Sequence, residues 1–291
     1  MNAFVLHLRD QEVGGAVTSG RLFRVSGDTE LDWDDRLPEF TTATRGQRLI
    51  ILVHGYNNTL SFGRARLMGF MNLLATGGNT DVMLSVLWPG DGWANALTYP
   101  FEARDADDTA TALLQWLTTN VDTSARIAFI GHSLGCRVVM NTAQQLARRT
   151  GGPQLDRICL MAPALDNDCL GRTGVTCYQE VTLAADRIAV LASEEDLVLR
   201  FAYPLGDLTH TFLLGERWGS ALGRTGPIEL EANILAKIEA VPKADPLRDI
   251  DHGDYMDLDQ NTQRQTIAES ETFVLQFLER LPKPRWPAQR S

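Results

Sequence analysis

The residues best suited to chemistry in this 291-residue chain lie at 131–135, where the sequence reads Gly-His-Ser-Leu-Gly. A strand-like run, Arg126–Ile130, precedes them, and a helical pattern starts at Leu134. A serine between two glycines at such a strand-to-helix turn sits on a sharp bend, with its hydroxyl exposed above the sheet edge. The following helix N-terminus favours negative charge nearby. The pattern therefore predicts that Ser133 is a nucleophile.

A second candidate group is the loop that follows the apolar run Arg48–Val53 and reads His-Gly-Tyr-Asn-Asn at 54–58. A strand that ends in His-Gly can place a backbone donor beside the nucleophile. We expect the amides of Tyr56 and Leu134 to form an oxyanion hole, which stabilises a tetrahedral intermediate. The same residues also suit an ordinary turn and helix cap, and both interpretations can hold together.

These groups resemble those of the α/β-hydrolases, and more narrowly a bacterial set of such proteins whose substrates are mostly unassigned. The matching segments are residues 53–58, 87–90, 131–137 and 251–255, within a resemblance that covers about residues 45–280. The resemblance implies an α/β fold with an eight-stranded, mostly parallel sheet and helices on both faces. Residues 1–45 would supply antiparallel first strands.

The resemblance implies the chain order serine, acid, histidine for a catalytic triad. His252 is then the best candidate for the base, because it follows a loop rich in Pro and Asp and precedes the last helical pattern. His210 is the reserve. His7 precedes the nucleophile, His132 adjoins it, and His54 more plausibly braces the oxyanion loop.

The acid must orient the histidine ring and stabilise the imidazolium. Asp196 is the first choice, because it follows the strand-like run Arg187–Ser193 at the position that the resemblance implies. Glu195 is an alternative in the same acidic group. Asp166, after the preceding strand-like run, is another. Each could instead be a solvated surface carboxylate.

Aromatic residues near these groups are candidates for a substrate pocket. His54, Trp88, Trp93, Phe201 and Tyr203 form this predicted set, and residues 197–226 form a possible lid or pocket insertion. Buried core aromatics would give the same pattern. The Pro-rich tail, 282–291, is expected to be extended.

Alternating strand-like and helical runs predict the elements that position these residues, in a single domain over 1–291. Strands are expected at 4–8, 22–25, 49–53, 82–88, 126–130, 157–161, 187–191 and 234–241, and helices at 62–74, 107–117, 134–146 and 272–281. The nearly continuous apolar strands suit a parallel sheet buried on both faces.

Composition limits the partners. The chain has 27 Lys and Arg against 37 Asp and Glu, a net charge of −10, which disfavours nucleic acid and anionic membranes. No secretory signal is recognised, so we expect a cytoplasmic protein with reduced thiols, although Cys169 and Cys177 are close enough in sequence to pair. Neither a metal nor another cofactor is expected, since the acidic group at 245–259 does not fit a calcium loop.

The sequence thus predicts a serine hydrolase that cleaves carboxylic esters through an acyl-enzyme, with a small, neutral ester as its substrate. An amidase, a thioesterase or an acyltransferase would use the same residues. A non-catalytic ligand-binding protein with a vestigial triad is the alternative of a different class. The oligomeric state is not predicted.

Overall fold

The computed structural model describes residues 2–26, 29–32, 36–90, 99–171, 177–200, 220–241, 250–256 and 264–279. Nine strands in these residues form one sheet, in the order β3-β2-β1-β5-β4-β6-β7-β8-β9. They are β1 (Ala3–His7), β2 (Arg21–Ser26), β3 (Thr29–Asp32), β4 (Arg48–Val53), β5 (Val82–Leu87), β6 (Arg126–His132), β7 (Gln154–Met161), β8 (Arg187–Leu191) and β9 (Ile238–Val241). All pairings from β1 to β9 through the centre of the sheet are parallel.

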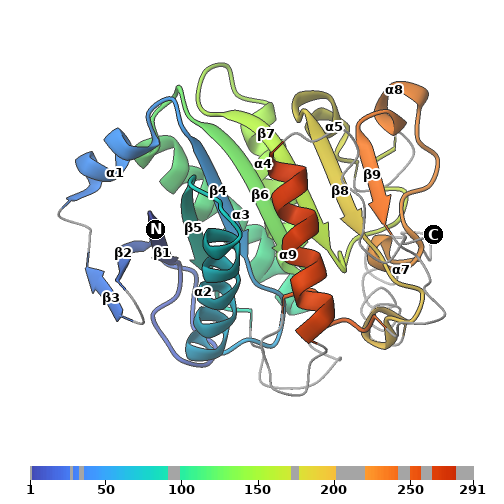
Figure 1. The fold of residues 1–291 in the computed structure, drawn as a ribbon, viewed down its shortest axis with the longest axis horizontal. Coiled ribbons are helices and arrows are strands. Elements are labelled where there is room, and N and C mark those ends of the chain that lie inside the picture. The colour runs from blue at the N-terminus through green and yellow to red at the C-terminus, as the bar shows by residue number, and fades with distance from the viewer. Residues whose placement is uncertain are drawn as a thin grey trace.

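Helices cover both faces of this sheet (Figure 1). The helices are α1 (Leu37–Thr44), α2 (Leu60–Thr76), α3 (Tyr99–Asn120), α4 (Gly135–Ala147), α5 (Gln179–Ala184), α7 (Leu222–Thr225), α8 (Ala232–Leu235) and α9 (Arg264–Leu278). Helices α2 and α9 contact each other on one face, and α3, α4 and α5 pack together on the other. The parallel strands therefore direct their carboxyl ends to one edge, where the loops can meet.

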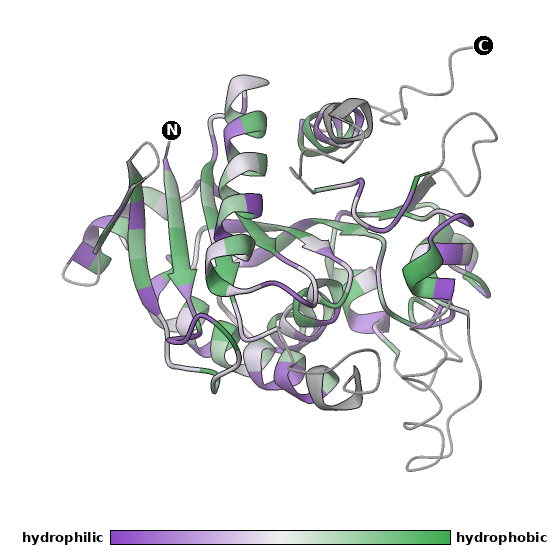
Figure 2. Ribbon diagram, turned by 90° about the horizontal axis from the view of Figure 1, so that it is seen from below, coloured by the Kyte–Doolittle hydropathy of each residue, from purple (hydrophilic) through white to green (hydrophobic). Residues whose placement is uncertain are grey.

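The apolar periodicity of the central strands explains this layering. Along β4, Leu49, Ile51 and Val53 belong to the core under α3 and α4, whereas Ile50 and Leu52 belong to the core under α2 and α9. Every second residue of a strand points to the same face, so a fully apolar strand supplies both cores. In Figure 2 the hydrophobic colour accordingly gathers on the strands of the sheet.

The N-terminal region differs from the expectation of two antiparallel edge strands. It forms three strands, because Thr29–Asp32 adds β3 to the antiparallel hairpin, and β1 itself pairs in parallel with β5. The sheet therefore has nine strands rather than eight. Residues 37–44 form the helix α1, whose Phe40 packs against Trp116. The short polar sequence of β3 carries little strand signal by itself.

The expected strand at 234–241 is also wrong in part. Residues 232–235 form one helical turn, α8, and only Ile238–Val241 pairs with β8. A short apolar run does not distinguish a strand from a helix by periodicity. Lys237, which follows the turn, donates to three carbonyls near the end of α5. The possible Cys169–Cys177 disulfide is absent, because both thiols are free. No helix among the described residues is long and apolar enough to cross a membrane.

Candidate active site

Ser133 sits on a strained turn between β6 and α4. Its φ angle is 52°, in the left-handed region that side chains other than glycine disfavour. The turn is fixed on both sides, because the Ser133 amide donates to the Met161 carbonyl and the Ser133 carbonyl accepts from the Cys136 amide. The hydroxyl is thus presented at the carboxyl edge of the sheet, as the Gly-His-Ser-Leu-Gly pattern predicts.

Close backbone packing explains the glycines around this serine. A Cβ at Gly135 would overlap the carbonyl oxygen of His54 and lie 2.8 Å from that of Val53. A Cβ at Gly55 would lie 2.7 Å from the Cβ of Ser133. The start of α4 therefore packs directly against the loop after β4, and no larger residue fits at this contact.

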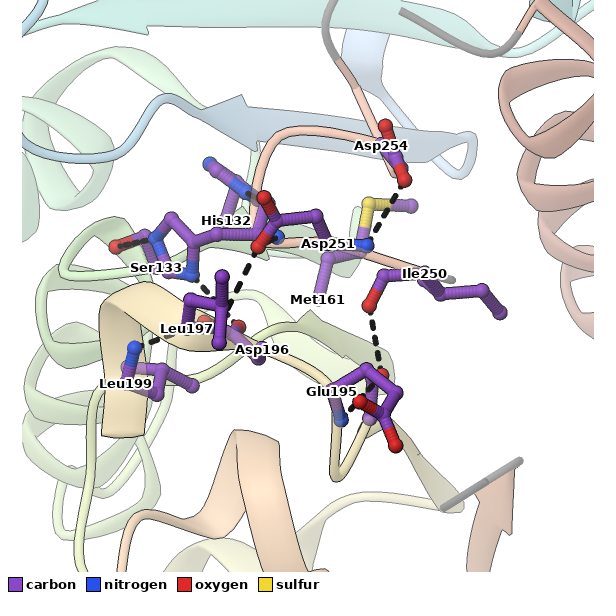
Figure 3. Close-up of polar contacts among 12 residues, drawn as sticks. His132, Ser133, Met161, Glu195, Asp196, Leu197, Leu199, Ile250, Asp251 and Asp254 are labelled. Atoms are coloured by element: carbon purple, nitrogen blue, oxygen red, sulfur yellow. Dashed lines mark hydrogen bonds and ion pairs between the residues drawn. The ribbon is translucent and has the colours of Figure 1, made fainter. Parts of the chain in front are cut away.

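His252 connects Ser133 to Asp196 in one hydrogen-bonded chain. Its Nε2 lies 2.7 Å from the Ser133 Oγ, and its Nδ1 lies 2.8 Å from the Asp196 Oδ2 (Figure 3). A carboxylate can only accept, so Nδ1 carries the proton and Nε2 is left to accept from the serine hydroxyl. Three residues separated by 56 to 119 positions in sequence are thereby brought to one point.

Asp196 is the carboxylate that meets the histidine, and neither alternative does. It is fully buried, and its Oδ1 accepts from the Leu199 amide at 2.8 Å. Glu195 is exposed to solvent. The backbone of Asp166 instead forms an isolated antiparallel β-bridge with that of Ala221. Burial with two donors keeps the Asp196 side chain in a single orientation toward the ring.

The loop that carries His252 is attached to the loop after β8. The Ser193 hydroxyl donates to the Ile250 carbonyl at 2.7 Å, and the Asp251 carboxylate accepts from the His252 amide at 2.8 Å (Figure 3). The Asp254 carboxylate accepts in turn from the Asp251 amide at 2.8 Å. The Ser193 contact thus attaches the His252 loop to the loop that carries Asp196, and the other two fix the conformation of the His252 loop itself.

His54 connects the loop after β4 to the end of β5 through hydrogen bonds on both ring nitrogens. Its Nδ1–H donates to the Gly55 carbonyl at 2.8 Å, and its Nε2 accepts from the Trp88 amide at 3.2 Å. Burial lowers the pKa of His54 to about 4, so the ring stays neutral in this arrangement. His54 lines a small cavity with Gly55, Asn58, Arg66, His132 and Met256.

Trp88 belongs to the protein core and has no exposed surface that could line a substrate pocket. Its indole N–H donates to the His54 carbonyl at 2.9 Å, and the two rings stack with centroids 5.6 Å apart. The expected pocket role of Trp88 is therefore wrong, and its side chain instead packs against the loop after β4. Trp93, Phe201, Tyr203 and the reserve base His210 lie outside the described residues.

The two expected oxyanion donors lie on either side of the contact between Gly55 and Ser133. The Leu134 amide follows the nucleophile at the start of α4 and meets no acceptor within the described residues. Tyr56 follows Gly55 in a turn where Asn57 has a φ of 60° and donates to the Gly90 carbonyl. Among those same residues, no group of three or more His, Cys, Asp or Glu side chains could hold a metal ion.

Arg9, just beyond β1, is a supporting residue that the sequence analysis did not single out. Its side chain is buried, and it donates to the carbonyls of Asn58 and Trp88 at 3.1 Å each. It also donates to the carbonyls of Gln11 and Glu12 at 2.9 and 2.8 Å. One guanidinium thus joins three loops at the carboxyl edge. The sequence around a single arginine after a strand does not indicate that its acceptors lie far away in the chain.

The fold and this site define an α/β hydrolase. The chain matches, over residues 32–207, the family described as "Alpha/beta hydrolase of unknown function (DUF900)", and it belongs to that family. The matched segment contains Ser133 and Asp196 but ends before His252 and begins after Arg9. A comparison with curated protein sequences gives no match.

A comparison with solved structures gives similarities to hydrolases at low sequence identity. A putative dienelactone hydrolase from Klebsiella pneumoniae is 12% identical, with 99% of this chain and 100% of that chain covered and a TM-score of 0.46. Esterase PE8 is 13% identical, with 81% and 93% covered and a TM-score of 0.41. An esterase from Pyrococcus furiosus is 13% identical, with 90% and 85% covered and a TM-score of 0.42.

Proposed function

We propose that the protein is a serine hydrolase that cleaves carboxylic esters through an acyl-enzyme intermediate. The observation that carries this proposal is the hydrogen-bonded chain from the Ser133 hydroxyl through His252 to Asp196. Serine is a weak nucleophile until a positioned base removes its proton, and this geometry supplies the base and its orienting acid. The strained φ of Ser133 supports the same role, because such strain concentrates at functional sites.

In the proposed first half-reaction, the Ser133 Oγ attacks the acyl carbonyl carbon while His252 Nε2 accepts the hydroxyl proton. The amides of Leu134 and Tyr56 would stabilise the resulting oxyanion. The C–O bond to the alcohol then breaks, and His252 returns the proton to the departing alkoxide oxygen. Asp196 stabilises the imidazolium during this transfer.

In the second half-reaction, His252 deprotonates a water molecule that attacks the acyl-enzyme carbonyl. Collapse of the second tetrahedral intermediate releases the carboxylic acid and restores the Ser133 hydroxyl. The exposed carboxylates of Glu194, Glu195 and Asp251 near the triad favour a neutral ester over an anionic one. The reaction needs no cofactor.

A fluorophosphonate probe tests the proposal directly, because it reacts with an activated serine. We expect the wild-type protein to be labelled at Ser133, and we expect Ser133→Ala to lose labelling while its thermal unfolding is unchanged. Ser124→Ala, at an exposed serine, is the matched control and should be labelled like the wild type. An unlabelled but folded wild-type protein would instead indicate a vestigial triad.

A substrate panel then distinguishes esterase activity from related reactions of the same residues. Chromogenic esters from acetate to decanoate, matched amides and thioesters, and an alcohol acceptor cover the four reaction classes. We expect turnover of neutral esters with the highest kcat/KM. If a labelled protein turned over amides or thioesters faster than esters, Ser133 would still be the nucleophile, but the proposed substrate class would be wrong.

A further inference from the structure

His132 precedes Ser133 in the chain and contacts the backbone of His252, but it takes no proton in the proposed reaction. Its side chain is nearly buried, and its ring centroid is 5.1 Å from that of His252. Its Nε2 lies 2.7 Å from the backbone carbonyl oxygen of His252. The residue directly before the nucleophile therefore contacts the backbone of the base.

The direction of this hydrogen bond is fixed by chemistry. A carbonyl oxygen only accepts, so the Nε2 of His132 must carry the hydrogen. Burial, followed by the nearby His252, lowers the pKa of His132 to about 3. The ring consequently stays neutral, with one donor, over the pH range in which an esterase works.

The His132 ring has a rigid support on the nucleophile side. His132 is the last residue of β6 and pairs with Met161 of β7, which holds its backbone in the sheet. The other edge of the ring packs against Gly55, where an added Cβ would lie 2.9 Å from the His132 Nδ1. The sheet thus holds the backbone of His132, and the loop after β4 packs against one edge of its ring.

The base loop receives support from two directions. The acid side holds it through Ser193, which donates to Ile250, and through Leu197, whose amide lies 3.4 Å from Asp251 Oδ1. The nucleophile side holds it through His132. The contacts to the acid loop hold the His252 loop relative to Asp196, whereas the His132 contact holds the His252 backbone relative to the end of β6, beside the side-chain hydrogen bond between His252 and Ser133.

We propose that His132 is a positioning residue, whose Nε2–H holds the His252 carbonyl and so sets the distance between the His252 ring and the Ser133 hydroxyl. This inference rests on the proposed serine-hydrolase function. It assigns a purpose to the histidine of the Gly-His-Ser-Leu-Gly pattern that lies outside the triad and the oxyanion hole. An ångström of displacement at a reacting pair is enough to slow the chemical step strongly.

Two amide substitutions separate positioning from general structural support. In His132→Gln, the side-chain N–H reaches roughly where the histidine Nε2 lies, so the donor to His252 is kept. In His132→Asn, the amide is the same chemical group but falls short of the carbonyl. We expect the Gln variant to be labelled by a fluorophosphonate within about threefold of the wild-type rate, and the Asn variant about tenfold or more slowly.

Turnover of a short-chain ester supplies a second readout. We expect the Asn variant to lose kcat with little change in KM, because substrate contacts are intact and only the base is displaced. Thermal unfolding of the two variants should be similar. If His132→Asn does not fold, His132→Leu replaces it and should show the same loss of labelling rate relative to His132→Gln.

The outcomes distinguish this inference from the proposed function. Equal labelling rates for the Gln and Asn variants, whether both fast or both slowed together, would overturn the positioning role while the labelled wild type retained the serine-hydrolase function. A wild-type protein that is not labelled would overturn the function and this inference with it. Slow Asn and fast Gln labelling would support both.

Discussion

The elbow that carries Ser133 and the loop that carries His252 are held in place by different kinds of contact. Besides the backbone hydrogen bonds of Ser133, the elbow depends on steric packing, since Gly131, Gly135 and Gly55 allow backbones to touch where a side chain would not fit. The base loop is fixed by polar contacts from Ser193, Asp251 and His132. Ser133 thus lies in a five-residue motif that packs closely against the loop after β4, whereas His252 depends on polar partners from β6 and from the loop after β8.

This difference has a consequence for substitutions. Steric packing fails through unfolding, because an added atom must push two elements apart. Polar contacts fail through loss of position, because the loop can persist with water in place of its partner. Changes in the elbow should therefore lower stability first, and changes around the base should lower activity first.

Asp196→Asn should give the largest loss of activity, because it changes the contact that orients His252. The amide cannot orient the imidazole as the buried carboxylate does, and it offers no charge to stabilise the imidazolium. We expect kcat to fall about 10³-fold or more, with little change in the thermal unfolding temperature. Steady-state kinetics on a short-chain ester checks this. Glu195→Gln, at the exposed neighbour, should leave kcat unchanged, and an equal loss there would reassign the acid.

Gly135→Ala should be the most damaging change in the elbow. Its Cβ would overlap the His54 carbonyl, and both groups are backbone, so we expect a loss of about 3 kcal/mol or more in the free energy of unfolding. Urea unfolding measures it. Gly46→Ala is the control, because the same Cβ is added at a position where no atom lies within 4 Å of it. Gly46 has a φ of 64°. The substitution should cost only about 1 kcal/mol for the left-handed backbone.

Low pH should destabilise the packing around the elbow, because His54 and His132 are buried as neutral rings. Their folded pKa values, about 4 and about 3, lie below the ordinary 6.5, so the unfolded chain binds protons more readily as pH falls. Their contribution is fully present above pH 6.5 and is lost progressively below it. Between pH 7.5 and pH 5, each should cost about 2 kcal/mol of unfolding free energy.

Urea unfolding of the His132→Gln variant at the two pH values isolates one of these contributions. The variant lacks one of the two titrating rings, so its loss on acidification should be smaller than the wild-type loss by about 2 kcal/mol. An identical loss in variant and wild type would mean that His132 is not buried as a neutral group.

Ser193→Ala should give the smallest losses of stability and activity, and it too acts on the loop that carries His252. It removes the donor to the Ile250 carbonyl, which costs about 1 kcal/mol of unfolding free energy and lowers kcat a few-fold. Ser85→Ala is the matched control, because its buried hydroxyl donates to Phe4 at 3.4 Å in the middle of β5. Ser85→Ala should lose comparable stability while its kcat stays at the wild-type value. Reduced activity in both variants would mean that the Ser193 contact has no special effect on His252.

Local sequence was sufficient for the elbow and for the layered architecture. The order strand, Gly-His-Ser-Leu-Gly, helix is a local pattern, because the residues that form the turn are neighbours in sequence. The apolar runs of β4 to β8 likewise predict strands buried on both faces, since periodicity reports burial directly. The weak predictions fell on short polar or ambiguous segments, namely Thr29–Asp32 and residues 234–241.

The sequence favours Asp196 as the acid, but its separation from the alternatives and the contacts of Trp88, His132 and Arg9 depended on tertiary structure. Glu195 and Asp196 are neighbours of nearly equal chemistry, and the structure distinguishes them because Asp196 is buried and contacts His252. Arg9 meets carbonyls 49 and 79 positions away, and His132 meets one 120 positions away. A backbone carbonyl belongs to every residue and leaves no mark in sequence, so these contacts exist only once the parallel strands bring their loops to one edge.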